Sequence, residues 1–176
     1  GSPAVISARD SMSEALANAC MEPLPTMTIS AAERLADASV VISPNLPEEC
    51  KAYETVPFGF DSGVVAYNVP GADSLNLGYG TLANLLNGQI KNWNDPQIAK
   101  DNKGIELPDL PIIVRDEADK NALSALTAAL SFQKATIESS NFKKIDFYEV
   151  QKLDPLVDGE IVVMPNSMAI GNSLST

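Results

Sequence analysis

The sequence predicts an α/β protein in which mixed sheets are flanked by helices. Three observations support this class. Short apolar runs alternate with segments whose apolar residues recur at helical spacing. Hydrophobic residues make up 45% of the chain and charged residues 20%, which is enough to build a core and is unlike a disordered segment. Several strand-like runs also end in small hydroxyl residues, which suit the start of a following helix.

The first part of the chain alternates between strand and helix. Strands are expected at 3–7, 26–29 and 39–43, and helices at 11–20 and 31–38. Each helix opens with a Ser followed three residues later by Glu, a capping box in which each side chain satisfies a backbone amide at the helix start. The third strand is apolar inside its two terminal serines, as expected for a parallel sheet covered on both faces.

The middle of the chain begins with a long strand-like run, 55–68. Gly59 and Gly63 interrupt it, so we expect a crossing between two lobes there. A short helix at 81–86 is closed by Asn87-Gly88.

The remaining elements are one short helix, one long helix and two strands. We expect them at 97–100 (helix), 112–115 (buried strand), 118–132 (amphipathic helix) and 160–164 (strand). Residues 141–150 fit a strand or a helix equally well.

Charge excludes two classes of partner. The formal net charge is -11, and both nucleic acids and anionic membrane surfaces are bound by clustered Lys and Arg. No apolar run approaches the roughly 18 residues that span a bilayer. We therefore expect no nucleic-acid binding and no membrane insertion by these 176 residues.

Cys20 and Cys50 are the two cysteines, and the chain has no histidine. A structural zinc site needs about four ligands, so no metal site and no cofactor are expected. The two cysteines form a single disulfide in an exported protein, or they are two separate thiols; the sequence leaves both open.

Three motifs in the middle of the chain follow one another almost without gaps. They are VVAYNVPG (64–71), LNL (75–77) and TLANLLNGQIKNWNDPQIAKDNKGIELPDLPIIVRDEAD (81–119). Together they resemble the phosphate-binding proteins of ABC transporters, a branch of the periplasmic binding proteins, over 57–116. The flanks, SAAERLADASVVISPNLPEEC (30–50) and DGEIVVMPNSMAIGNSL (158–174), resemble the same family more weakly.

The resemblance implies a periplasmic-binding-protein-like fold of two small lobes. Lobe I is expected at 1–56 with 165–176 and lobe II at 57–164, the whole forming one compact unit at 3–176. The chain is much shorter than full-length members of the family, so it resembles a pared-down version of the two-lobe fold.

Two of the motifs have structural readings of their own. Pro70-Gly71 fits a turn in which Pro fixes one φ and Gly accepts a positive one. Trp93 is expected to anchor a core, and Asn94-Asp95-Pro96 to cap the short helix that follows.

The family's binding site, as the resemblance implies, holds a tetrahedral oxyanion between the lobes. Arg115 stands where the family has its Arg, which offers a fork of donors matched to oxyanion oxygens. The relatives continue with Ser-Asp-Gly-Ser-Gly-Thr, which closes over the anion. This chain continues instead with Asp116-Glu117-Ala118-Asp119-Lys120-Asn121, so the Gly that permits close backbone approach and both hydroxyls are replaced.

The first lobe is altered as well. Ser43 aligns with the family's Asp at the end of the third strand. Of the family's Ser- and Gly-rich loop after the second strand, only Ser30 is kept. Residues 7–11 stand in place of the family's first Gly-rich loop. The candidate ligand-binding residues are therefore Arg115, Ser30, Ser43, Ser7, Ser11, Arg9 and Asn121. Each serine could instead cap a helix or end a strand, and Arg115 could instead pair with a neighbouring carboxylate.

Losing several donors and gaining acidic neighbours should weaken anion binding by several kcal/mol, at about 1 kcal/mol per lost hydrogen bond. Two functions follow. One is an extracytoplasmic solute-binding module that holds phosphate or another small oxyanion weakly and partners an ABC permease. The other is a non-transport interaction or sensory domain of a larger cell-surface or membrane-anchored protein.

Catalysis is not expected. The serines have no His partner, and Lys120 and Ser124 fit a surface pair on one helical face.

Overall fold

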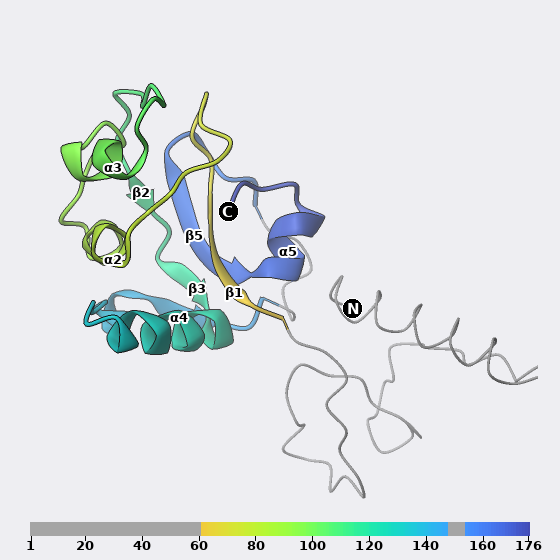
Figure 1. The fold of residues 1–176 in the computed structure, drawn as a ribbon. Coiled ribbons are helices and arrows are strands. Elements are labelled where there is room, and N and C mark those ends of the chain that lie inside the picture. The colour runs from red at the N-terminus through yellow and green to blue at the C-terminus, as the bar shows by residue number, and fades with distance from the viewer. Residues whose placement is uncertain (1–60, 148–153) are drawn as a thin grey trace, which may run out of the picture. The chain divides into compact units, whose positions relative to one another are not determined.

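The computed structural model describes residues 61–147 and 154–176, which belong to one compact unit, Asp61–Thr176 (Figure 1). In chain order its elements are β1 (Gly63–Tyr67), α2 (Tyr79–Leu86), α3 (Pro96–Asp101), β2 (Ile113–Val114), β3 (Glu117–Asp119), α4 (Lys120–Phe132), the 3-10 turn η2 (Ser139–Asn141), β4 (Lys143–Ile145), β5 (Glu160–Pro165) and α5 (Asn166–Gly171).

The described strands form two small sheets. The larger has the order β1-β5-β2, with β5 antiparallel to β1 and parallel to β2. The smaller joins β3 and β4 in parallel. The prediction of an α/β fold with mixed sheets and flanking helices is therefore confirmed for the described part of the chain.

β5 is the buried centre of the larger sheet, and all six of its residues are buried. Successive side chains of a strand point to opposite faces. Ile161 and Val163 accordingly join one hydrophobic cluster, and Val162 and Met164 join the other. The predicted strand 160–164 is confirmed.

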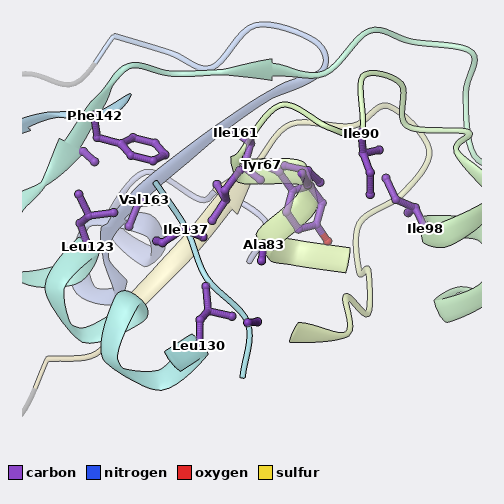
Figure 2. Close-up of a cluster of buried hydrophobic side chains, with 14 of the residues drawn as sticks. Tyr67, Ala83, Ile90, Ile98, Leu123, Leu130, Ile137, Phe142, Ile161 and Val163 are labelled. Atoms are coloured by element: carbon purple, nitrogen blue, oxygen red, sulfur yellow. The ribbon is translucent and has the colours of Figure 1, made fainter. Parts of the chain in front are cut away.

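Helices cover both faces of this sheet (Figure 1). The first cluster takes its helical residues from α2, α3 and α4, and the second from α5. Figure 2 shows Leu123 and Leu130 of α4 in the first cluster with Ile161 and Val163 of β5. Fully burying one such side chain contributes about 1.5–3 kcal/mol, so these contacts hold the helices on the sheet.

Two glycines permit close packing of the sheet. A Cβ on Gly63 would lie 2.8 Å from the Cα atom and from the carbonyl oxygen of Ala122, so the glycine lets the first turn of α4 approach β1. Gly159 has φ +83°, and a Cβ there would collide with the carbonyl oxygen of Pro111. Glycine is the residue that suits both demands.

The local predictions around the turns are confirmed. Residues 70–71 form a turn, and Gly71 has φ +80°. Asp95 caps α3, because its Oδ1 accepts from the Gln97 amide at 2.8 Å and Pro96 takes the first helical position. Trp93 is fully buried, and its Nε1 donates to the Gly159 carbonyl at 3.0 Å.

Several element boundaries differ from the predictions by one or two residues, and sheet pairing explains two of them. The strand expected at 112–115 is shorter, and Ile113 is 46% exposed, because β2 lies at the edge of the sheet with a strand partner on one side only. The helix expected at 118–132 begins at Lys120, because β3 pairs with β4 before the helix starts. That pairing also makes 143–145 a strand, within the segment left open between strand and helix.

Several predictions fall outside the described residues. They are the elements within 3–43, the first part of the run 55–68 and the pairing of Cys20 with Cys50. The division into lobe I and lobe II stays a prediction. Within the described unit, α5 and the residues after it pack beside β1, since the Tyr67 amide donates to the Ser175 carbonyl at 3.0 Å.

Over 61–147 and 154–176, no helix has both the length and the apolar character to cross a membrane. In the same part of the chain, no group of three or more His, Cys, Asp or Glu side chains is placed to hold a metal ion.

Candidate functional site

Arg115 lies directly after β2, and its backbone amide donates to the Ile161 carbonyl at 2.9 Å. Its guanidinium forms a two-pronged ion pair with Glu160, from Nε to Oε1 at 2.7 Å and from Nη2 to Oε2 at 3.0 Å. The two remaining bonds run from Nη1 and Nη2 to the Asp154 carbonyl at 3.3 and 3.4 Å. The pairing of Arg115 with Glu160 has the fork geometry in which Arg binds a carboxylate most strongly.

Glu160 is held from two sides. Besides Arg115, the Val157 amide donates to its Oε2 at 2.9 Å. The side chains of Arg115 and Glu160 are 14% and 10% exposed. Burial acts to raise the pKa of Glu160, but the bonds from Arg115 and Val157 and the charge of Arg115 together lower it below its ordinary value. Glu160 is therefore ionised near neutral pH and holds the guanidinium.

Asp119 closes the N-terminus of α4. It is fully buried, and its Oδ1 accepts from the amides of Asn121 and Ala122 at 3.0 and 2.9 Å. Its Oδ2 accepts from the Phe147 amide at 3.2 Å. Amides at a helix start attract anions because they lack partners within the helix, and here a carboxylate of the chain itself meets that demand.

Glu117 and Lys120, two other charged residues of this turn, are also paired. Glu117 accepts from Lys143 Nζ at 2.8 Å, and this pair is largely exposed. Lys120 Nζ lies 2.8 Å from Asp146 Oδ2. The lysine bonds offset part of the expected crowding of carboxylates after Arg115.

Two features therefore correspond to the anion-holding groups that the resemblance implies, and we call them the anion positions: the Arg115 guanidinium and the first amides of α4. Each is occupied by a carboxylate of the same chain, Glu160 in one case and Asp119 in the other. An incoming oxyanion has to displace an internal carboxylate at either place.

Of the other predicted ligand-binding residues, Asn121 lies in the first turn of α4, where its backbone amide donates to Asp119 Oδ1. Ser7, Arg9, Ser11, Ser30 and Ser43 lie outside the described residues, so their grouping with Arg115 stays a prediction.

Sequence reasoning did not identify Glu160, Asp154 or the capping role of Asp119. One signal was available for Glu160, which is the single charged residue at the head of an otherwise apolar strand. A charge in that place needs a partner when it is buried, and Arg115 was the candidate.

Several known proteins resemble this chain over part of its length. No protein-family profile matches. A phosphate-binding protein, PstS2, of Mycobacterium bovis BCG is 34% identical over 113 residues, which is 60% of this chain. Phosphate-binding protein PstS 2 of Mycobacterium tuberculosis is 40% identical over 86 residues, or 49% of this chain. The chain is a distant and partial homologue of phosphate-binding proteins.

A relative outside the mycobacteria matches as well. The phosphate-binding protein PstS of Pasteurella multocida is 50% identical over 48 residues, or 27% of this chain. The aligned regions span 29%, 22% and 14% of the three phosphate-binding proteins, so this chain corresponds to less than a third of each. The resemblance drawn from the motifs is thus confirmed as partial homology.

Proposed function

We propose that this chain is a solute-binding-like module that keeps part of the scaffold of phosphate-binding proteins and serves as a non-transport interaction domain. In this proposal the module belongs to a larger protein of the cell surface or membrane, and neither anion position holds phosphate. The observation that carries the proposal is the two-pronged ion pair between Arg115 and Glu160.

The energetics of that pair support the proposal. Separating a buried ion pair costs about 3–5 kcal/mol when one charge is left without a partner. Phosphate would have to offset that cost to bind Arg115. Since about 1.4 kcal/mol corresponds to a tenfold change in affinity, the pair weakens phosphate binding there by roughly two to three and a half powers of ten.

The N-terminus of α4 argues in the same direction. The Asp119 carboxylate is covalently attached and already bonded to three amides, so it competes with a free anion without loss of translational freedom. It also adds a negative charge where phosphate would bring at least one more.

Titration with inorganic phosphate, followed by NMR, tests the proposal. The Arg115 side chain and the amides of Asn121 and Ala122 are the reporters. We expect no saturable shift up to about 10 mM phosphate, a range that detects binding as weak as roughly 3 kcal/mol. Saturable shifts of these signals in the natural sequence would refute the proposal.

Two matched variants sharpen the titration. Glu160→Gln removes the charge that holds Arg115, and Glu117→Gln removes a charge from an exposed ion pair close by. We expect a phosphate response at Arg115 in the first variant and none in the second. The complete gene product provides a separate test, because other extracellular or transmembrane domains in the same polypeptide would support the interaction role.

A second candidate function rests on the homology. The relatives are phosphate-binding proteins. On that basis, the chain would act outside the cytoplasm, bind phosphate or another oxyanion weakly between two lobes and deliver it to an ABC permease. Ser7, Arg9, Ser11, Ser30, Ser43 and Asn121 would then join Arg115. Shifts at Arg115 in the natural sequence, with a millimolar dissociation constant, would favour this candidate.

A further inference from the structure

A second place in this unit has the form of a binding site. A pocket of about 330 Å³ opens where three segments meet: the end of β1 at 67–68, the segment 154–156 before β5, and the segment 172–175 after α5. The volume lies at the lower end of the range for small-molecule sites. Neither Arg115 nor the start of α4 is among the lining residues.

Hydrogen bonds fix each wall of the pocket. The Asn68 side-chain amide donates to the Leu156 carbonyl at 3.1 Å and to Asp158 Oδ1 at 3.2 Å. The Tyr67 amide donates to the Ser175 carbonyl at 3.0 Å, and the Leu174 amide to the Ala169 carbonyl at 2.9 Å. Arg115 holds the Asp154 carbonyl. The pocket is therefore formed before any ligand arrives, which lowers the cost of binding.

The chemistry of the lining is asymmetric. Asp154 is the one charged residue among the described residues that line the pocket, and no Lys or Arg is among them. Asn172, Ser173 and Ser175 add hydrogen-bonding groups, while Pro155, Leu156 and Leu174 supply apolar surface. Ser173 follows the C-cap Asn172 of α5, and its φ of +55° is the left-handed conformation that commonly ends a helix.

We propose that this pocket binds a small organic cation, a primary ammonium with a short apolar body. A carboxylate bonds strongly to an ammonium donor, and the hydroxyl and amide groups can accept its remaining hydrogens. The apolar residues suit a hydrocarbon stem. A bare divalent cation fits poorly, because it requires six or more oxygen ligands that are mostly charged or carbonyl groups.

The inference does not depend on the proposed interaction role or on phosphate. Its ligand carries the opposite charge, and of the two anion positions only Arg115 is bonded to a wall of the pocket, through the Asp154 carbonyl. The net charge of -11 also favours the approach of cations over anions.

NMR titration of the whole chain with n-butylamine at neutral pH tests the inference, with n-butanol as the uncharged analogue. We expect saturable shifts of the Asn68, Leu156 and Leu174 amides with the amine in the millimolar range and much weaker shifts with the alcohol. Absent shifts, equal shifts with both probes, or shifts spread over other acidic residues would each overturn the inference.

Two variants isolate the carboxylate. Asp154→Asn should weaken amine binding about tenfold or more, as expected for losing a charged hydrogen-bond partner, and it keeps the backbone carbonyl that Arg115 holds. Glu106→Gln makes the same charge change at an exposed residue outside the pocket and should leave binding unchanged. An unchanged affinity in Asp154→Asn, or equal losses in both variants, would refute the assignment.

Discussion

Two ion pairs begin only two residues apart in the sequence and differ in almost every physical respect. Arg115 and Glu160 are 14% and 10% exposed and share two bonds, whereas Lys143 and Glu117 are 65% and 40% exposed and share one. We call Arg115–Glu160 the inner pair and Lys143–Glu117 the outer pair. The inner pair also holds the backbone at Asp154 and Val157. The inner pair therefore fixes the segment that leads into β5, while the outer pair lies at the surface.

The largest expected effect comes from breaking the inner pair. Arg115→Met should destabilise the unit by about 3 kcal/mol, the lower end for a pair that is not fully buried, because it leaves the Glu160 carboxylate without its cation. Urea unfolding followed by circular dichroism measures the loss.

The double variant Arg115→Met with Glu160→Met provides the control for this prediction. It removes both charges, so it should recover most of the lost stability. Equal destabilisation of the single and double variants would mean that the unpaired Glu160 carboxylate is not the source of the loss.

A slightly smaller effect is expected at Asp119, the buried carboxylate that caps α4 and belongs to neither ion pair. Asp119→Ala should cost about 2–3 kcal/mol, because α4 loses its cap and the Phe147 amide loses its partner. Asp119→Asn should cost less, since the amide oxygen can still cap the helix. Equal unfolding midpoints for the Ala variant and the natural sequence would contradict the role given to this side chain.

The dependence of stability on pH separates the pairs further. The folded-state pKa values of Glu160 and Glu117 are both lowered, so their contributions are present above the ordinary value of 4.5 and are lost as pH falls through the folded values. We expect the destabilisation caused by Glu160→Gln to shrink between neutral and acidic pH. Added salt should reduce the contribution of Glu117 much more than that of Glu160. The measurement is the urea midpoint against pH at low and high salt, and a pH-independent Glu160→Gln effect would contradict it.

The smallest effect is expected at the outer pair. Lys143→Met should leave the urea midpoint unchanged within error at physiological salt, because water and ions screen the exposed charges. A clear loss of stability would mean that Lys143 contributes to the β3–β4 pairing in a way that its exposed ion pair does not explain.

Much of the fold could be predicted because its signals are local. The cap at Asp95 with Pro96 and the turn at Pro70-Gly71 each depend on neighbouring residues whose backbone preferences are strong. β5 could be predicted because an apolar run has few alternatives to burial.

The site was less predictable, because its contacts span long distances in the sequence. Arg115 and Glu160 are 45 positions apart, and their meeting depends on the parallel register of β2 with β5. The start of α4 depended likewise on pairing between β3 and β4. Periodicity places a side chain on one face of an element and does not identify the opposite strand.

Trp93 has a practical consequence. It is the only tryptophan in the chain, it is fully buried, and its indole donates to the Gly159 carbonyl next to Glu160. Its fluorescence emission should therefore shift to longer wavelength when this unit opens, while unfolding elsewhere in the chain contributes no tryptophan signal. One optical measurement can thus follow the 61–176 unit by itself in the presence of the complete polypeptide.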